Sequence, residues 1–458
     1  MEQKIYKNKK DFIQDIIDYN SGFYNNNDYF SIVVSNIHRI IDFNFYLRDI
    51  LDIISKEKNT SHFYLFFERI TFLKKCSISK INNDFTFVSI TFIDIKFNKF
   101  YFDHNTINFP LSFILCDFNN PVIFILSQIT SSMRFNKTNF YEEINFIKFD
   151  IIGNCIFELV EIYKSIEFYQ AEINNELLFS NAILKNNDAY ISFNNYEENN
   201  INRLYIINTN LNNKFIFENT NIIQIDLSNT VLNDNVIMIN SCIKNCLNSQ
   251  TARILKNEEL KKSNYIKALE YQAEETKLHK EELKEQFKKD KNLKTFGDIL
   301  SIELSSIYSD NGQNWIKAFI ITLLTNLTFF GFYFSIVNNT WHFILSIFII
   351  LLLSIKFIKK EIQIYVYLLI LIISGIVFGK VPLKIIYDLF IGQSETSNFL
   401  YRFFIFLNPT NYDGLSILSG QNYIKQFFSG ICYFLGKIAF WYGSVQTVTA
   451  FRKFAKGA

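Results

Sequence analysis

The chain has 458 residues, of which 49% are hydrophobic, and a formal net charge of +2 at pH 7. Residues 1–250 carry 22 basic and 28 acidic residues, whereas residues 301–458 carry 12 basic and 6 acidic residues. The acidic first half argues against a nucleic-acid-binding face there. The basic and apolar C-terminal part favours a membrane domain whose flanks carry Lys and Arg.

Residues 1–82 contain two stretches, residues 9–19 and 29–55, in which charged and apolar residues interleave at helical spacing. They predict a mostly helical N-terminal region over residues 1–82. The segment before Asn20 has basic residues but no uninterrupted apolar run. A cleavable signal is therefore not expected, and the N-terminal half is expected to stay in the cytoplasm.

From residue 83 the apolar residues recur at every fifth position, which is neither the helical spacing of three and four nor the simple alternation of a strand. Two such ladders run two residues apart, and a third follows later. Their members are Phe85, Ile90, Ile95 and Phe100; Phe87, Phe92, Phe97, Phe102 and Ile107; and Phe217, Ile222, Leu227, Leu232 and Ile237.

A chain with this period can wind into a narrow coil of four short strands, with a tight turn after every fifth residue. The ladder residues then point inward and form a continuous core. Asn and Asp suit the turns because their side chains bond the local backbone. The period therefore predicts a β-solenoid, and an irregular sandwich of short strands is the alternative.

Four segments resemble the unit of the bacterial pentapeptide-repeat proteins, which is a small residue, then Asp or Asn, then Leu or Phe, then two variable residues. They are Thr138-Asn139-Phe140, Thr209-Asn210-Leu211, Thr220-Asn221-Ile222 and Ile225-Asp226-Leu227. The chain departs from that unit where Phe215 and Ile225 take the small position and where Leu211 and Phe217 stand six residues apart. The resemblance implies a degenerate, right-handed pentapeptide-type β-solenoid over residues 83–245.

Residues 251–295 read as a helical hairpin linker, rich in Ala, Leu, Glu and Lys and free of Gly and Pro. Its two helices are expected to meet near Lys262-Ser263-Asn264. The apolar face available for packing comprises Tyr265, Leu269, Ala273 and Leu283. A solvated spacer is the alternative. The stretch also resembles the hairpin that separates the repeats from a C-terminal membrane region in one group of pentapeptide-repeat proteins.

Four apolar runs follow, at residues 315–337, 341–358, 362–379 and 426–451. About 20 apolar residues cross the hydrocarbon core of a bilayer. If the first half is inside, the two cytoplasmic turns carry the basic residues, as the positive-inside rule requires. These residues are Lys356, Lys359, Lys360, Arg452, Lys453 and Lys456. The sequence therefore predicts a bundle of about four transmembrane helices over residues 315–458, with both termini cytoplasmic, in the bacterial inner membrane.

Two segments of the tail, FLNPTNYDG at residues 406–414 and VQTVTAFRKFAKG at residues 445–457, resemble the outer loop and the final helix end of the membrane-anchored group. Lys437 lies near the middle of the fourth run, where an ammonium group is costly and often functional. It is the candidate functional intramembrane charge, and snorkelling to the outer interface is the alternative.

The fourth run also carries small residues seven positions apart, which form a candidate helix-packing stripe. They are Ser429, Gly436, Gly443 and Ala450. Packing within one helix bundle is favoured, because four spans offer enough internal partners. A contact between the subunits of a homo-oligomer is the alternative.

Catalytic and metal-binding patterns are not recognisable in the sequence. Only Gly22 and Gly153 precede Gly297, so no Gly-rich phosphate loop is present. The six cysteines contain no CxxC pair and predict buried thiols in a reducing compartment, rather than a zinc site or disulfides. We therefore expect neither an enzyme nor a cofactor.

The sequence predicts a membrane-anchored cytoplasmic protein-interaction scaffold whose partners are the lipid bilayer and an unknown cytoplasmic protein. A pore or transporter subunit with a regulatory solenoid is the alternative, against which the single mid-span charge argues. The resemblance to other pentapeptide-repeat proteins also allows a mimic of duplex DNA. The small excess of acidic over basic residues in the first half and the membrane anchor disfavour it. Nucleic acid is therefore not an expected partner.

Overall fold

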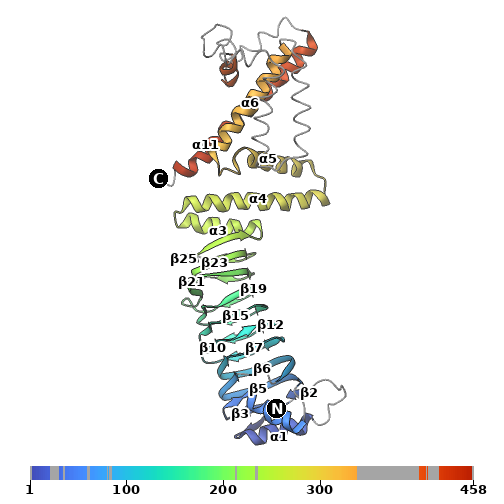
Figure 1. Cartoon of the computed structure of the whole chain (residues 1–458), viewed down its shortest axis with the longest axis vertical. Helices are drawn as coiled ribbons and strands as arrows, with labels where there is room; N and C mark the ends of the chain where they lie inside the picture. The colour runs from blue at the N-terminus through green and yellow to red at the C-terminus, as the bar shows by residue number, and fades with distance from the viewer. Residues whose placement is uncertain are drawn as a thin grey trace. The chain divides into compact units, whose positions relative to one another are not determined.

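The computed structural model of the protein describes residues 3–20, 30–34, 37–58, 62–79, 81, 85–211, 214–232, 236–337, 402–408, 410 and 422–455. It divides into two compact units, residues 1–282 and residues 283–458. The first unit contains a parallel β-solenoid of about eight turns, as the sequence predicts (Figure 1). The second unit is helical where it is described.

The strands of the solenoid join into one 26-stranded sheet, in which strands pair in parallel with those of neighbouring coils. The first strands are β1 (Gln3–Tyr6), β2 (Phe30–Val34), β3 (His38–Ile41), β4 (Phe45–Tyr46), β5 (His62–Ser79) and β6 (Thr86–Asp103). The middle strands are β7 (Thr106–Ile107), β8 (Leu111–Ile114), β9 (Asp117–Phe118), β10 (Val122–Ile125), β11 (Gln128–Ile129), β12 (Ser132–Asn136), β13 (Asn139–Phe140), β14 (Ile144–Ile147), β15 (Asp150–Ile151), β16 (Asn154–Glu158), β17 (Glu161–Ile162) and β18 (Ser165–Tyr169). The last strands are β19 (Glu172–Ser180), β20 (Ile183–Leu184), β21 (Tyr190–Ile207), β22 (Asn210–Leu211), β23 (Lys214–Asp226), β24 (Val231–Leu232), β25 (Val236–Ile239) and β26 (Cys242–Cys246).

The N-terminal region is not mostly helical, which corrects the expectation for residues 1–82. Helix α1 (Lys9–Asn20) matches the first predicted helix, but in the second predicted helix, residues 29–55, the described residues form β2, β3, β4 and the first part of α2 (Leu47–Lys58). Strand β5 pairs in parallel with β2, β3, β4 and β6, so the solenoid begins before residue 83. Pairing with the next coil, which local spacing does not reveal, decides the conformation of this region.

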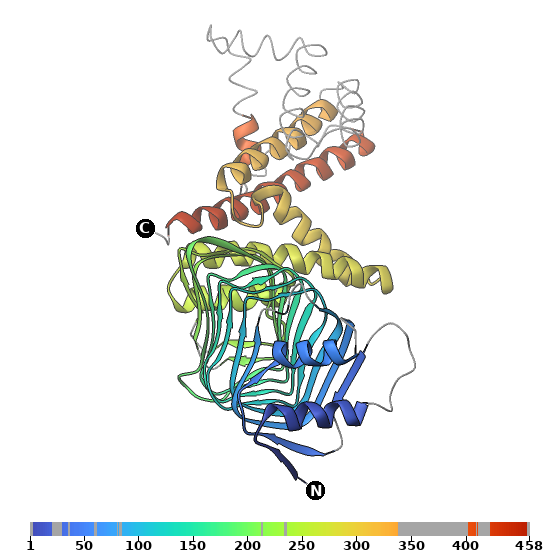
Figure 2. The same ribbon diagram turned by 60° about the horizontal axis from the view of Figure 1, so that its bottom comes forward.

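Both ends of the solenoid are covered by helices. Helices α1 and α2 lie at the N-terminal end of the solenoid (Figure 2). Their side chains Phe12, Ile16, Ile50 and Ile54 are buried in the solenoid core. A terminal coil exposes unpaired apolar and backbone surface, and a cap removes it from water.

At the C-terminal end the cap is formed by α3 (Ser249–Lys261) and α4 (Tyr265–Lys289), which meet at the predicted turn. Ala252 and Tyr271 belong to the solenoid core, and Thr251 Oγ1 accepts a hydrogen bond from the backbone N–H of Leu227 at 2.8 Å. The hairpin is therefore a cap and not a solvated spacer. Tyr265, which was expected on its packing face, is instead 42% exposed.

The coil of the central solenoid is longer than four sides of five residues. It has 22 residues, the sequence separation of the stacked and hydrogen-bonded pair Asp117 and Asn139. Val122 likewise pairs with Phe100 in the coil before and with Ile144 in the coil after. Inward positions therefore follow one another at alternating steps of five and six. One buried series is Leu111, Cys116, Val122, Ser127, Met133, Thr138, Ile144 and Phe149.

A residue with positive φ recurs at every eleventh position and makes a corner of each half-coil. These residues are His104, Leu115, Leu126, Lys137, Lys148, Leu159, Gln170 and Asn181. Such a conformation costs roughly 1–2 kcal/mol for a residue with a Cβ. Each corner is held by the next coil: the N–H of Leu115 donates to Asn136 O and the N–H of Lys137 donates to Glu158 O, both at 2.9 Å.

The second unit contains α5 (Leu293–Ser309), α6 (Trp315–Val337), a short helical segment at residues 402–407 and α11 (Tyr423–Ala455). Helix α6 has the bounds of the first predicted span, and α11 contains the fourth. The predicted spans 341–358 and 362–379 lie outside the described residues. Among the residues described, one helical stretch, Trp315–Tyr333, is long and apolar enough to cross a membrane. The expected linker, residues 251–295, overlaps the start of α5, a helix that the sequence analysis did not identify.

Candidate functional site

The predicted ladder from residue 217 to residue 237 lies inward for most of its length. Phe217, Ile222 and Leu227 are buried and Leu232 is partly buried, whereas Ile237 is 38% exposed and faces outward. The prediction is wrong at Ile237 because successive coils are offset here by 21 residues, and not by the four times five residues that the ladder requires. Phe217 therefore pairs with Met238, which packs on the core in place of Ile237.

Since the core is filled and both ends are capped, the surface that the solenoid leaves exposed is its side wall, by which we mean the outward-facing side chains from β6 to β24, corners included. Successive coils place equivalent residues about 4.8 Å apart along the axis. Ion pairs between neighbouring coils run along this wall, for example Lys185 Nζ to Glu161 Oε1 at 2.9 Å and Arg203 Nη1 to Glu176 Oε1 at 3.0 Å.

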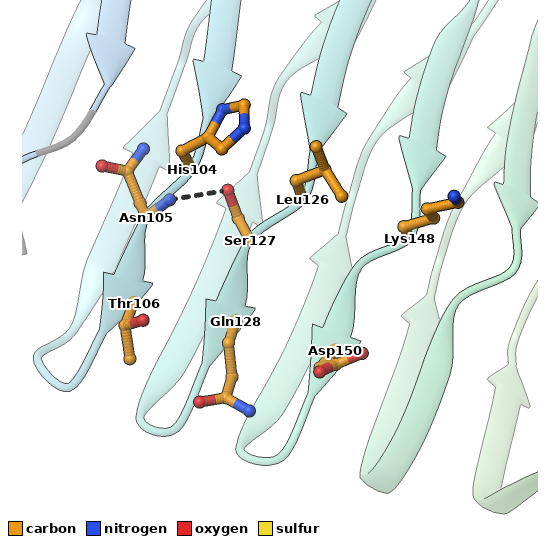
Figure 3. Close-up of a pocket in the computed structure, with 8 residues that line it drawn as sticks. All are labelled: His104, Asn105, Thr106, Leu126, Ser127, Gln128, Lys148 and Asp150. Carbon is orange, nitrogen blue, oxygen red and sulfur yellow. Dashed lines mark hydrogen bonds between the residues drawn. The ribbon is translucent and has the colours of Figure 1, made fainter.

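A shallow, open groove of about 470 Å³ lies on the side wall (Figure 3). The equivalent corners of three successive coils, the short strands that follow them and two residues between these elements line it. The lining residues are His104, Asn105, Thr106, Leu126, Ser127, Gln128, Lys148 and Asp150. Sequence reasoning missed them, because the corners, His104, Leu126 and Lys148, share no residue type that would mark them.

The polar groups of the groove are largely committed to the fold. Asn105 is buried, its Nδ2 donates to Ile78 O at 2.8 Å, and its backbone N–H donates to Ser127 Oγ at 3.0 Å. Burial raises the pKa of Asp150, and the neighbouring carboxylate of Glu172 adds to the effect. The corners of His104 and Lys148 are two coils apart, or about 10 Å by strand spacing. The groove therefore does not bring His104 and Lys148 close enough together for proton transfer between them.

In the second unit, α6 and α11 form an antiparallel pair, since Trp315 contacts Phe451 and Tyr333 contacts Tyr433. The small-residue stripe of α11 faces this contact. A Cβ at Gly443 would lie 2.1 Å from Thr322 Oγ1, and one at Gly436 would lie 2.2 Å from Phe406 Cζ and 3.2 Å from Phe329 Cβ. Ser429 and Ala450, at the ends of the stripe, are fully buried.

Lys437 is 6% exposed and points at the C-terminal end of the helical segment 402–407. Its Nζ donates to the carbonyl oxygens of Ile405 at 3.4 Å, Phe406 at 2.7 Å and Asn408. The last carbonyls of a helix lack intrahelical donors, so the ammonium group serves as their cap. Lys437 is thus buried against the carbonyl oxygens of a neighbouring helix end, and its role as an intramembrane charge stays a prediction.

Three donors on three carbonyls exhaust the hydrogen-bonding capacity of the ammonium group. The ring of Tyr433 lies 5.0 Å from Nζ and contributes a cation–π contact. Two of the bonded carbonyls, those of Phe406 and Asn408, belong to the FLNPTNYDG segment. The start of this segment is therefore held to α11 by Lys437, which the sequence analysis singled out for its place in the fourth apolar run.

Within the described ranges, no group of three or more His, Cys, Asp or Glu side chains is placed to hold a metal ion. Four cysteines, Cys76, Cys116, Cys155 and Cys246, are buried, and burial raises the pKa of each thiol. No family model, curated protein or solved structure matches the chain.

Proposed function

We propose that the protein is a membrane-anchored interaction scaffold, in which the α6–α11 pair is the anchor and the side wall of the solenoid binds a cytoplasmic protein. The resemblance to pentapeptide-repeat proteins and the parallel β-solenoid support the scaffold, because a rigid repeat with capped ends presents a long lateral surface. The groove at His104, Lys148 and Asp150 is a candidate contact within that surface.

The observation that carries the anchor is the inverted polarity of the α6–α11 pair. The contact buries polar groups, including Thr322, Asn326 and Ser429, while large apolar side chains point outward. The exposed side chains include Phe319 (50%), Phe434 (66%), Ile438 (48%), Trp441 (57%) and Val445 (56%). In water this arrangement is unfavourable, and in a bilayer it is the expected one.

Two experiments test the proposal. Alkaline carbonate washing of membranes should leave the full-length protein in the pellet, whereas release into the supernatant would contradict the anchor. A photo-crosslinking residue at Leu159 or Tyr141 on the side wall should then capture a cytoplasmic protein, while one at Leu260 on the C-terminal cap should not. All three positions are at least 38% exposed. A difference in capture between them therefore reflects where the partner binds, and not how accessible each position is.

The alternative, a pore or transporter subunit with a regulatory solenoid, is disfavoured by the contacts of Lys437, whose three donors are used by carbonyls. Ion flux through liposomes that contain the purified protein would favour this alternative over the scaffold.

A further inference from the structure

Helix α5 also has inverted polarity. Five of its seven Leu, Ile and Phe residues are exposed, whereas Ile299 and Ile302 are partly buried. The exposed ones are Leu293 (84%), Phe296 (49%), Leu300 (48%), Leu304 (38%) and Ile307 (48%). Steps of three and four residues place them on one face of the helix, which we call the α5 stripe. On other faces Thr295, Tyr308 and Ser309 are buried. A water-facing helix would show the opposite distribution.

The polar face of α5 packs against α11 through hydrogen bonds and a ring contact. Ser305 Oγ and Ser309 Oγ donate to Gln446 Oε1 at 3.3 Å and 2.8 Å, and the rings of Tyr308 and Tyr442 meet edge to face at 5.2 Å between centroids. Gln446 belongs to the VQTVTAFRKFAKG segment. These contacts fix the orientation of the helix, so that the α5 stripe points away from the α6–α11 pair.

The position of α5 and its charges point to a lipid surface as the occupant of the stripe. The helix ends shortly before Trp315, the first residue of α6, and tryptophan favours the level of the lipid headgroups. Exposed apolar surface continues onto Ile316 and Phe319 of α6. Exposed lysines lie just before α5 and in its first turn, where they complement anionic headgroups. They are Lys288, Lys289, Lys291 and Lys294.

We propose that α5 is an interfacial helix, which lies along the cytoplasmic surface of an anionic bilayer with the α5 stripe immersed at the boundary of the acyl chains. Helices of this kind bury their apolar face about 5–10 Å into that boundary. The inference rests on the proposed membrane anchor and adds a second contact with the bilayer. It also gives Gln446 a role, since this residue sets which face of α5 meets the lipid.

The test uses the full-length protein with Cys242 and Cys432, its partly exposed cysteines, replaced by Ser, in vesicles of phosphatidylethanolamine and phosphatidylglycerol. A polarity-sensitive fluorophore is attached in turn to Leu300→Cys in the stripe, to Asp298→Cys on another exposed face of α5, and to Ile438→Cys near the middle of α11. Some vesicles contain lipids with a spin-label quencher near the headgroup, and others contain lipids with the quencher deep in the acyl chain.

We expect blue-shifted emission at Leu300→Cys, quenched more strongly by the shallow quencher than by the deep one, and water-like emission at Asp298→Cys. Ile438→Cys should be quenched by the deep quencher. A water-like Leu300→Cys, or equal quenching at residues 298 and 300, would overturn the interfacial helix while Ile438→Cys still supports the anchor. Blue-shifted emission without quenching would mean that protein covers the stripe, which also overturns the inference. Absence of quenching at Ile438→Cys would overturn the anchor and the inference that rests on it.

Discussion

Phenylalanine rings fill the solenoid core because the distance between successive coils matches the distance between two stacked rings. Parallel strands lie about 4.8 Å apart. The ring centroids of Phe124, Phe146 and Phe168 are separated by 4.7 Å at each step, and those of Phe113 and Phe135 by 5.0 Å. Aromatic pairs add about 0.5–1.5 kcal/mol each beyond the area that they bury. One inward phenylalanine therefore favours another at the equivalent place in the next coil.

Two adjacent residues of β8 test this core. Phe113 is fully buried and its ring stacks between those of Phe92 and Phe135, whereas Ser112 faces outward beside Arg134 of the next coil. Phe113→Asp should lower the free energy of unfolding by more than the roughly 3–5 kcal/mol typical of removing a buried ring, because it also buries a carboxylate. Ser112→Asp should be neutral or slightly stabilising. Thermal melts of the purified protein, followed by circular dichroism, check both, and equal melting temperatures would contradict the inward assignment.

Lys437 is the second residue for which the contacts predict a clear loss of stability on substitution. Lys437→Leu removes the donors of three carbonyls, and an unsatisfied buried polar group costs about 1–3 kcal/mol. The variant should therefore melt at a lower temperature in detergent, and Lys437→Arg should retain part of the stability. Lys425→Leu, near the start of α11, is the control. An unchanged melting temperature for Lys437→Leu would show that the cap at residues 405–408 contributes nothing.

At the scale of elements, the close approach of α6 and α11 depends on glycine. A Cβ at Gly443 would overlap Thr322, whereas a Cβ at Gly430 of the same helix would meet nothing within 4 Å. Gly443→Ala should cost about 1–3 kcal/mol through overpacking, while Gly430→Ala should gain up to about 1 kcal/mol of helix propensity. Protease resistance of the membrane-bound protein would compare the two. Equal resistance would indicate that the helices do not meet at Gly443.

The α3–α4 cap should weaken in acid. Burial alone would raise the pKa of Glu275, but hydrogen bonds from Lys256 and Arg253 of α3, both at 2.7 Å, outweigh it and leave this pKa below its ordinary value. A carboxylate with a lowered pKa stabilises the fold above its unfolded pKa, and this contribution is lost as the pH falls from about 5 through the folded pKa.

Hydrogen exchange of β26, compared at each pH between the wild type and Glu275→Gln, would measure this loss. The wild type should be better protected at neutral pH, and the difference should vanish in acid. A difference in protection that persists at low pH would show that the contribution of Glu275 does not depend on its charge.

At the scale of the whole molecule, the length of one coil decides which changes the solenoid accepts. A copy of residues 111–132, inserted between Ser132 and Met133, adds one whole coil and keeps every corner in register with its neighbours. A copy of residues 113–132 is two residues shorter. It preserves the inward alternation, but it moves each later corner by two positions relative to the coil before. The first insertion should fold and melt near the wild-type temperature, and the second should be strongly destabilised. A higher melting temperature for the shorter insertion would instead support a coil of four sides with five residues each.

Local pattern was sufficient for much of this architecture. The recurrence of apolar residues at every fifth position predicts the solenoid, because side-chain direction in each short strand depends only on neighbours along the chain. Likewise, the bounds of α6 and the turn at Lys262-Ser263-Asn264 follow from apolar runs and helix composition. These features involve contacts between residues that are close in sequence.

Tertiary structure alone decided the features that depend on residues far apart. The length of the coil is set by hydrogen bonds between successive coils, which can place Leu115, Leu126 or Leu159 at a corner where local preference would choose Asn or Gly. Strands β2 to β4 form because β5 pairs with them in parallel, although the spacing of their apolar residues also fits a helix.

The contacts of the second unit also join residues far apart in sequence. Lys437 binds carbonyl oxygens at the end of another helix, 29 to 32 residues earlier in the chain. The orientation of α5 likewise depends on Gln446, 137 residues after Ser309. Sequence spacing carries no record of such pairings, because they arise only when the chain folds back on itself.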